Sequence, residues 1–371
     1  MTAIEIREIV SLDKIEALRQ AWTDLFDDSL QPTVFGAWEW QYLAAKHIAE
    51  PGSVRILTAY EDDNLVGVLP LASGRTKVGG IFPAATLRCL GGDITDYNAL
   101  LVKRSFLPPV IRAMRDYLSR TGMIVILQNV LPGSPLDVLG RYMTRAGFYR
   151  AVYESKVALV SRLDGDHEHF MKLLTKKFQG TLRNNQNYMD RSGGYTYHVE
   201  PDSAELLDAL INLHTSRWKH KGKHGALATR QVRDFHAELS QIDNKPFGIQ
   251  YHTIRHEGDI AAILYGFVFR NRFMAYLSGF DMTHDRISPG NMVFHYCIRQ
   301  LYDDGAAVFD MLRGDAKYKQ TWATATYEMQ DALYFPPSAS GRLLYGATRT
   351  MQGIKRAVPV AVKRRLKSLI P

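Results

Sequence analysis

The sequence contains little cysteine and no long apolar run, and both absences limit what the protein can be. Cys89 and Cys297 are the two cysteines in 371 residues, so we expect no disulfide framework and a reducing compartment. No stretch approaches the roughly 18 consecutive apolar residues of a membrane-spanning helix. The first residues alternate like a β-strand and lack the layout of a signal peptide. Together these features predict a cytoplasmic protein.

Several common functional motifs are also absent. There is no glycine-rich phosphate loop, no dinucleotide-binding fingerprint and no Gly-x-Ser-x-Gly nucleophile elbow. The pairs His167/His169 and His220/His224 have the spacing of metal ligands, but neither lies near a cysteine or a set of carboxylates. We interpret them as solvated loop histidines and predict no metal site.

Basic residues are concentrated near the end of the chain. The formal net charge is +8, yet no acidic residue follows Asp331, whereas eight basic residues lie between Arg342 and Lys367. Without these eight, 38 basic residues balance 38 acidic ones, so the body is formally neutral and we expect no DNA partner. Residues 336–371 alternate apolar and basic residues, with an interruption at Pro359. They predict a basic amphipathic tail with peripheral contact to the inner face of a membrane, or a tail packed on the protein.

The chain divides into two halves of similar pattern. The first half predicts helices at 11–27 and from 37 onward, and strands at 53–59, 65–71 and 123–129. The second half predicts strands at 156–163, 196–200, 248–255, 259–270, 272–281 and 308–312, and helices at 168–190, 204–219, 230–241 and 291–302. This order is typical of an α+β (mixed α/β) fold. We expect two tandem domains, 1–150 and 151–335, each with a mostly antiparallel central sheet flanked by helices.

The most informative stretch runs from Ser288-Pro-Gly290 to the loop that follows Asp310. A glycine turn that opens a helix offers free backbone N–H groups and the positive end of the helix dipole to an anion. The next predicted strand is followed at once by a loop rich in ionisable groups. This arrangement indicates an acyl-donor site.

Each residue of the turn has a functional and an ordinary interpretation. Arg286 is a candidate phosphate clamp through charge-assisted hydrogen bonds, or a solvated loop arginine. Ser288, Gly290 and Asn291 are candidate anion donors at the helix start. The alternative is an ordinary cap, with Ser288 at the N-cap and Pro289 at the first helical position.

The loop after the strand supplies the catalytic candidates. Asp310 and Asp315 are candidate general bases, because burial would raise an aspartate pKa toward the working pH. The alternative is a capping aspartate or one paired with Arg313. Tyr318 is a candidate proton donor to a leaving thiolate, or an anchor of the loop. Lys319 is a candidate for pairing with a substrate anion or for stabilising an oxyanion.

These motifs in this order resemble the GNAT acyltransferase superfamily, in particular its CelD-like polysaccharide-biosynthesis branch, which is similar to the FemAB-type transferases. The resemblance covers most of residues 30–325. The motifs that carry it are Arg183, Leu213–Trp218, Tyr276–Asp281, Ser288–Gly290, Asp310–Asp315 and Tyr318–Trp322, with Trp38–Trp40, Gly67–Leu71 and Leu90–Tyr97 in the first half.

The resemblance implies acyl-CoA, acetyl-CoA first, as co-substrate. In this superfamily the strand before the turn splays from its neighbour and pairs with the pantetheine arm. That places Tyr276, Ser278, Phe280 and Asp281 along the donor, and the pyrophosphate on the turn from Arg286 to Asn291. The departure from the family pattern is Pro289, which stands where a glycine is usual.

The resemblance also assigns a substrate side and a relation between the halves. Arg183, Arg217, Trp218 and Arg313 are implied on the substrate side, with core packing as the alternative for Trp218. The first half lacks the turn and the charged loop, so we interpret it as a degenerate GNAT-like domain.

We therefore expect an N- or O-acyltransferase that moves an acyl group from acyl-CoA to a sugar or cell-envelope precursor. One alternative is a FemAB-type transferase that uses aminoacyl-tRNA on a peptidoglycan precursor, against which the neutral body counts. Another alternative is a non-catalytic adaptor of a membrane polysaccharide synthase that docks through the tail.

Overall fold

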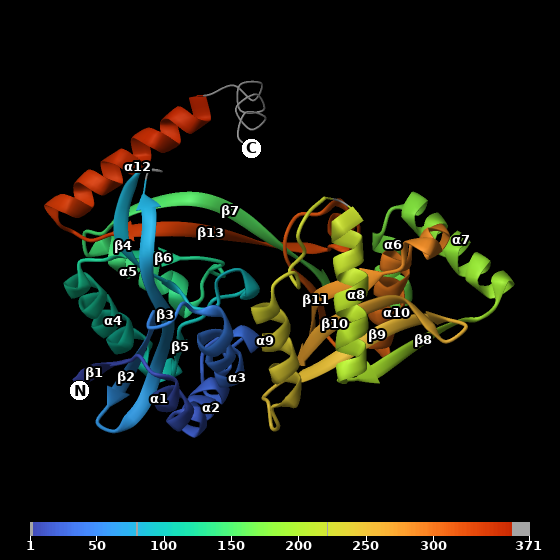
Figure 1. Cartoon of the computed structure of the whole chain (residues 1–371), viewed down its shortest axis with the longest axis horizontal. Helices are drawn as coiled ribbons and strands as arrows, with labels where there is room; N and C mark the ends of the chain where they lie inside the picture. The colour runs from blue at the N-terminus through green and yellow to red at the C-terminus, as the bar shows by residue number, and fades with distance from the viewer. Residues whose placement is uncertain (1–2, 79–80, 221, 358–371) are drawn as a thin grey trace. The chain divides into compact units, whose positions relative to one another are not determined.

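The computed structural model describes residues 3–78, 81–220 and 222–357, whose helices and strands are drawn in Figure 1. The chain forms two compact units. The first unit consists of Met1–Pro32, Ala49–Ser155 and Gln330–Pro371, and the second of Thr33–Ile48 and Lys156–Met329. This division departs from a single boundary near residue 150, because 33–48 joins the second unit and 330–335 joins the first.

The first unit is built on a mostly antiparallel sheet. Its strands are β1 (Ile4–Ile9), β2 (Val54–Glu61), β3 (Asn64–Val78), β4 (Phe82–Cys89), β6 (Ile124–Leu127) and β13 (Ala325–Phe335), in that spatial order, with β5 (Leu101–Val102) paired to β3. The β4–β6 pair is parallel, and the other pairs are antiparallel. The predicted hairpin between β2 and β3 is present, and Asp62 at its turn has a φ of 54°.

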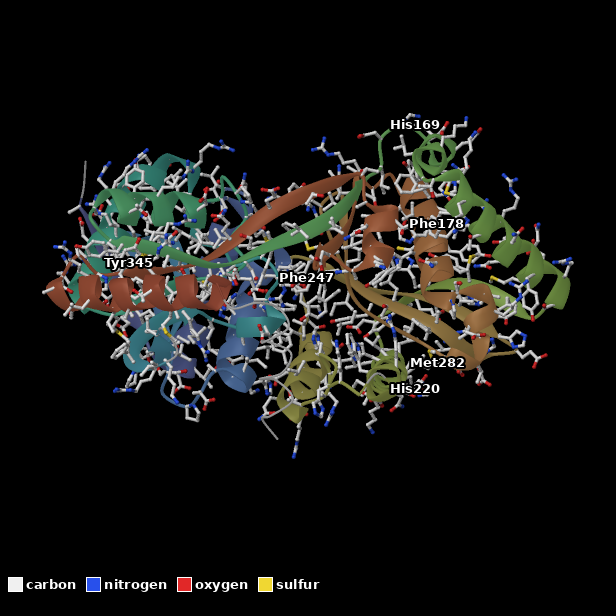
Figure 2. All side chains as sticks on the ribbon, turned by 90° about the horizontal axis from the view of Figure 1, so that it is seen from above. His169, Phe178, His220, Phe247, Met282 and Tyr345 are labelled. Atoms are coloured by element: carbon white, nitrogen blue, oxygen red, sulfur yellow. The ribbon has the colours of Figure 1, made fainter. Side chains whose placement is uncertain are left out.

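Helices cover both faces of this sheet. They are α1 (Leu12–Ala17), α2 (Arg19–Asp27), α4 (Leu107–Thr121), α5 (Pro135–Arg145) and α12 (Ala339–Ala357). Val125 and Leu127 of β6 share a core with α4 and α5, whereas Ile124 and Ile126 share another with α12. Because side chains alternate across a strand, α12 lies on the face opposite α4 and α5. Tyr345 of α12, labelled in Figure 2, stacks on Tyr149, with ring centroids 5.4 Å apart.

The strands of the second unit are mostly antiparallel as well. Its strands, in spatial order, are β7 (Tyr149–Arg162, from Lys156 onward; its earlier residues belong to the first unit), β12 (Val308–Arg313), β11 (Arg272–Phe280), β10 (Asp259–Phe269), β9 (Gly248–His256) and β8 (Tyr195–Pro201). The β11–β12 pair is parallel, and the other pairs are antiparallel. The predicted meander of three strands from 248 to 281 is confirmed. The predicted α+β class, with mostly antiparallel sheets flanked by helices, is confirmed as well.

Two groups of helices enclose this second sheet. The helices are α3 (Trp38–Leu43), α6 (His167–Leu173), α7 (Lys176–Ser192), α8 (Ala204–His220), α9 (Arg230–Gln241), α10 (Pro289–Asp303) and α11 (Lys317–Trp322). Apolar residues of α6, α7 and α10 share one core with the sheet. Trp40 of α3 packs instead on Phe235 of α9, with ring centroids 4.9 Å apart, and on Tyr276 of β11 at 5.6 Å. This aromatic packing explains why 33–48 belongs to the second unit.

Two expected helices are interrupted. The helix predicted at 168–190 is divided into α6 and α7, because Thr175 has extended backbone and its hydroxyl accepts the N–H of Phe178, which starts a new helix. The predicted helix at 11–27 is likewise divided, into α1 and α2. The predicted tail is helical from Ala339 to Ala357, and its remaining residues, including Pro359, lie outside the described part. Within the described residues, no helix meets the length and hydropathy needed to cross a membrane.

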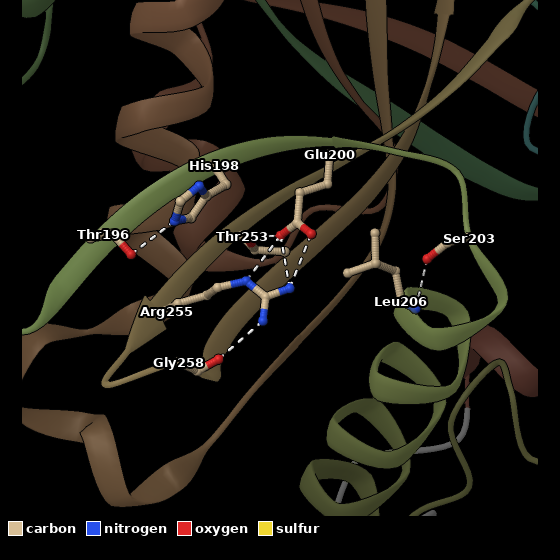
Figure 3. A network of polar contacts seen from close by, with 8 residues as sticks. All are labelled: Thr196, His198, Glu200, Ser203, Leu206, Thr253, Arg255 and Gly258. Atoms are coloured by element: carbon tan, nitrogen blue, oxygen red, sulfur yellow. Dashed lines mark hydrogen bonds and ion pairs between the residues drawn. The ribbon is translucent and has the colours of Figure 1, made fainter.

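A polar network ties the edge strand β8 to the second sheet (Figure 3). The carboxylate of Glu200 on β8 accepts hydrogen bonds from the guanidinium of Arg255 at 3.0 Å and from the hydroxyl of Thr253 at 2.5 Å, both on β9. Partial burial alone would raise the pKa of Glu200, but these hydrogen bonds outweigh it and hold the pKa below its ordinary value. The network therefore stabilises the β8–β9 pair most when Glu200 is ionised.

Candidate functional site

The centre of the candidate site is an open edge on β11. The parallel ladder between β11 and β12 joins Arg272 to Val308 and ends where Met274 lies beside Asp310. On its other side β11 stays paired to β10 as far as Phe280. Among the described strands, none pairs with residues 275–280 on the side away from β10. This stretch thus presents backbone N–H and C=O groups that another extended chain can bind.

The edge is open because β12 changes course. The register between β12 and β7 shifts between Asp310 and Arg313, and Leu312 within this bulge has a φ of 58°. A leucine in the left-handed region is strained and persists only where its surroundings fix it. The N–H of Leu312 donates to the Oδ1 atom of Asp310 at 2.8 Å, which fixes the bulge.

Asp310 is placed as an anchor. Its side chain is fully buried, and its Oδ2 atom accepts a hydrogen bond from Nη1 of Arg272 at 2.7 Å. Burial alone would lower the pKa of Arg272, but the charge of Asp310 outweighs it and holds that pKa above its ordinary value. The geometry therefore favours the arginine-paired alternative for Asp310, with Arg272 as the partner in place of the expected Arg313.

Lys319 also anchors β12. Its ammonium group donates to the carbonyl oxygens of Met311 at 2.6 Å and Arg313 at 2.7 Å. These carbonyls belong to the end of the strand, where the ladder has stopped. Asp315, the second base candidate, is exposed on the following loop. The structure therefore separates the two candidate bases, one buried and paired and the other in water.

Residues from four different elements converge beside the open edge. The guanidinium carbon of Arg217 on α8 lies 4.4 Å from the ring centroid of Phe280 on β11. A Cβ atom at Gly290 on α10 would come within 3.3 Å of the same ring. Tyr318 of α11 packs edge-on against Phe294 of α10, with centroids 5.8 Å apart. The sequence-predicted residues Phe280, Gly290, Arg217 and Tyr318 are thus brought together.

Arg217 is a cation without an acidic partner in the described chain. Its Nε atom is buried and makes no hydrogen bond there. Burial lowers the pKa of Arg217, and the nearby Tyr318 partly offsets this effect. Burial in turn raises the pKa of Tyr318, so its hydroxyl stays protonated at neutral pH. A buried Nε–H group without an acceptor is costly, so the site favours an anion or a polarised oxygen beside Arg217.

The neighbouring Trp218 is held by packing within the second unit. Its indole Nε1 donates to Nε2 of His214 one helical turn earlier, at 2.9 Å. Burial lowers the pKa of His214 to about 4, so this imidazole is neutral. Gly225 allows the close approach of the next loop, because a Cβ atom there would lie 2.4 Å from His214. The contacts favour the core-packing alternative for Trp218.

The turn before α10 starts the helix without a side-chain cap. Ser288 is the N-cap residue but has a left-handed backbone, and Pro289 is the first helical residue. The carbonyl of Ser288 accepts the N–H groups of Asn291 at 2.8 Å and Met292 at 3.1 Å. Gly290, in the first turn, has an N–H with no acceptor within the helix. The turn therefore keeps a backbone donor beside the ring of Phe280.

The remaining candidates lie around this centre in mostly structural contacts. The exposed Arg286 stacks over Tyr188 of α7, with the guanidinium carbon 5.0 Å from the ring centroid. Asn291 accepts a hydrogen bond from the indole of Trp322 at 3.3 Å. Arg183 is exposed on α7. Asp281 accepts the backbone N–H of Thr283 at 2.8 Å, and this bond lowers its pKa.

Two further residues that the sequence predicted for the site lie on β11. Ser278 is half-buried and lies opposite Leu264 of β10. Tyr276 faces the aromatic group around Trp40. Sequence reasoning missed Arg272 and Phe294. The register that sets Met274 beside Asp310 is the signal that would have pointed to Arg272, and only three-dimensional packing reveals Phe294.

Comparison with known proteins agrees with this geometry. Residues 176–320 match the family described as "Acetyltransferase (GNAT) domain". This segment spans α7 to α11 and contains the open edge, the turn and the anchored loop. This segment is thus similar to a GNAT-type acetyltransferase domain. No curated protein sequence matches the chain significantly.

Solved structures share the fold at low identity. The crystal structure of FemX has 10% identity and a TM-score of 0.61, with 92% of this chain and 100% of that chain covered. The C-terminal domain of a putative lysylphosphatidylglycerol synthetase from Agrobacterium fabrum has 12% identity and a TM-score of 0.56, with coverages of 92% and 95%. L-PGS from Bacillus licheniformis has 16% identity and a TM-score of 0.52, with coverages of 92% and 98%. The TM-scores establish a common fold, and at identities this low the similarity shows the fold alone.

Proposed function

We propose that the protein transfers an acyl group, with acetyl as the first candidate, from acyl-CoA to an amine or hydroxyl. The proposed acceptor is a sugar or another precursor of the cell envelope or of an exopolysaccharide, as in the CelD-like branch. The observation that carries the donor assignment is the edge of β11 beyond Met274, where the ladder with β12 has ended, and this edge runs to Phe280 beside Gly290 and Arg217.

The residues present fit such a donor. The amide groups of a pantetheine arm match an unpaired strand edge in hydrogen-bonding chemistry. The pyrophosphate would be held by the start of α10, through the N–H of Gly290 and the positive end of the helix dipole, with Arg286 near by. Acyl-CoA supplies an activated thioester. The part of this chain is to bind it, orient it and exclude water through the rings of Phe294, which is buried, and Phe280, which is partly buried.

Tyr318 and Arg217 have the chemistry for the reacting end. The neutral phenol of Tyr318 is a proton donor suited to a leaving thiolate. Arg217 is a donor for the oxygen on which negative charge develops. We predict that Asp310 or Asp315 takes the proton from the acceptor. Because Asp310 is already paired with Arg272, its pairing favours an acceptor amine that arrives unprotonated, or a base in the solvent-exposed loop.

Binding of acetyl-CoA and CoA, measured by isothermal titration, tests the donor. Gly290→Asp sets a carboxylate and a clashing side chain against Phe280, so we expect binding to fall at least about tenfold. Gly180→Asp is the matched control, because Gly180 lies in α7 with open space around its Cβ position. Arg286→Ala is paired with Arg299→Ala at the exposed far end of α10. Equal affinity in Gly290→Asp and wild type would overturn the donor site.

A FemAB-type transfer from aminoacyl-tRNA is the second candidate, favoured by the fold shared with FemX. It predicts transfer that RNase abolishes, and a folded protein that does not bind acyl-CoA. A non-catalytic adaptor predicts neither donor affinity nor RNase-sensitive transfer. The same titration, together with a transfer assay run with and without RNase, therefore separates the three functions.

We also propose peripheral contact of the basic tail with the inner face of a membrane. Arg342, Leu343 and Arg349 are exposed on α12, and Leu343 retains 75% of its accessible surface. Cations beside an exposed apolar residue suit an anionic lipid surface. Co-sedimentation with phosphatidylglycerol vesicles should weaken in Leu343→Asp. Equal sedimentation of that variant and wild type would count against the contact.

A further inference from the structure

A cavity of about 490 Å³ lies in the first unit, between its sheet and α12. The donor-site residues belong to the second unit, so this cavity is a separate feature. Its lining comes from β3, β4, β6, β7, β13 and α12. The lining residues are Thr76, Lys77, Val78, Arg88, Ile126, Gln128, Tyr153, Leu333, Thr348, Met351 and Gln352. Its volume is in the range of small-molecule sites, roughly 300–1,000 Å³.

One wall of the cavity is apolar. Val78, Ile126 and Leu333 belong to the core that packs under α12, and Met351 of α12 completes this wall. An adaptable methionine among branched side chains suits an aliphatic group of variable shape. This wall therefore has the chemistry to hold an aliphatic or aromatic group of a ligand.

The polar part of the lining contains a buried acceptor without a hydrogen-bond donor. The side-chain amide of Gln352 donates to the carbonyl of Val152 at 3.1 Å, while its Oε1 atom is buried and accepts no hydrogen bond from the described residues. A buried acceptor without a donor costs about 1–3 kcal/mol. A hydroxyl or N–H on a ligand would satisfy it. Tyr153, also in the lining, adds a phenol hydroxyl that is neutral at working pH.

The charges at the cavity are of one sign. Lys77 on β3 and Arg88 on β4 are exposed, and neither forms an ion pair within the described chain. No acidic residue is among the lining residues. The nearest acidic residue on the same strand as Leu333 is Asp331, which is fully buried and accepts the backbone N–H of Asn129 at 2.7 Å. The open side of the cavity therefore favours an anion.

We propose that this cavity binds a small amphipathic anion, that is, an apolar group that carries a phosphate or a carboxylate. The apolar group lies against Ile126, Leu333 and Met351, and the anion pairs with Lys77 and Arg88. Ile81 is 62% exposed, and Phe82, which begins β4 opposite Val78, is 47% exposed, so both add apolar surface at this end of the β3–β4 pair. This proposal does not depend on the acyl-CoA donor site.

The test uses the full chain and dodecyl phosphate below its micelle concentration, with inorganic phosphate as the headgroup alone. We expect saturable binding of dodecyl phosphate at one site, and binding of inorganic phosphate at least about tenfold weaker. The double variant Lys77→Glu/Arg88→Glu should weaken dodecyl phosphate binding at least about tenfold. Arg104→Glu, an exposed arginine of the same unit outside the cavity, should leave it unchanged.

A second variant keeps the proposal testable if the charge reversals disturb folding. Met351→Trp fills the cavity from the surface of α12 and should also abolish binding while the far-UV spectrum and the acetyl-CoA affinity stay at wild-type values. Absence of saturable binding to wild type would overturn the proposal. Equal weakening in Arg104→Glu and in the double variant would overturn it too, because the attraction would then be non-specific.

A vesicle arm identifies the source of the ligand. Sedimentation with phosphatidylglycerol vesicles that is lost in Ile81→Asp/Phe82→Asp, together with dodecyl phosphate binding, assigns the cavity to a membrane lipid. Dodecyl phosphate binding without any effect of that variant on sedimentation assigns it to a soluble amphiphile. Both results support the shared chemistry.

Discussion

Replacing Asp310 by asparagine separates an anchoring role from a catalytic one. The substitution keeps the shape of the side chain and removes its charge. In the structure this charge faces the guanidinium of Arg272 at 2.7 Å, within a side chain that has no exposure to water. We therefore expect Asp310→Asn to destabilise the second unit whatever it does to activity.

The magnitude follows from what the substitution leaves behind. Removing one partner of a fully buried ion pair costs roughly 3–5 kcal/mol, because the other charge is stranded. The side chain of Arg272 is 30% exposed, so water relieves part of this cost. We expect a loss of about 2–4 kcal/mol in the free energy of unfolding, which corresponds to a drop of about 5–12 °C in Tm for a unit of this size.

Urea unfolding followed by tryptophan fluorescence measures this loss. Trp38, Trp40, Trp218 and Trp322 all belong to the second unit, so the signal reports mainly on it. Asp315→Asn is the matched control, because its exposed carboxylate should contribute less than about 0.5 kcal/mol. The double variant with Arg272→Gln should lose less than the sum of the single losses. Wild-type stability of Asp310→Asn with a large fall in turnover would refute the anchoring role and identify a base.

Three other predictions concern ionisation and anchoring. The folded-state pKa of Glu200 is lowered, so the stability that its carboxylate contributes is present above its unfolded pKa near 4.3 and is lost as pH falls through the folded value. The difference in urea midpoint between wild type and Glu200→Gln should therefore be constant from about pH 6 to 8 and vanish near pH 3. Lys319→Met should lower the free energy of unfolding by about 1–3 kcal/mol, and the control Lys317→Met, at an exposed position, should lower it by less than about 0.5 kcal/mol. Equal losses for the two variants in urea titrations would contradict the anchoring role of Lys319. Burial raises the pKa of Cys89 to about 12, so mass spectrometry should find it unmodified by iodoacetamide at pH 8 until urea unfolds the protein, and rapid labelling of the native protein would argue against its burial.

Much of the fold could be predicted from the sequence because its periodicities are local. The meander from 248 to 281 was marked by apolar alternation and by short polar turns, and its turns indeed contain left-handed residues at Glu257 and Arg270. The assignment of 33–48 to the second unit could not be predicted this way. It depends on Trp40 meeting Phe235 and Tyr276, residues almost 200 or more positions away, and no local pattern encodes such a contact.

The position of the candidate site in the fold could be predicted from the sequence better than the roles of its residues. The Ser-Pro-Gly turn and the strand before it were found because helix starts and strands have local signals. For Asp310 the arginine-paired alternative was among the expectations, but with Arg313 as partner in place of Arg272, which lies across the parallel pair. The anchoring of Lys319 was not found, because it depends on where the end of β12 places its carbonyls. An aspartate in a charged loop has the same local pattern whether it takes a proton or holds a backbone N–H.

The open edge of β11 and the anchoring of β12 are two consequences of one arrangement. Leu312 holds a left-handed backbone only while Asp310 accepts its N–H, and the end of the strand stays in place while Lys319 binds its carbonyls. If either anchor is lost, β12 is free to continue its ladder along β11 and to close the edge that we assign to the donor. A fall in activity after substitution of Asp310 or Lys319 is therefore no proof of a catalytic group, and donor affinity measured beside unfolding free energy is the quantity that distinguishes a closed edge from a missing base.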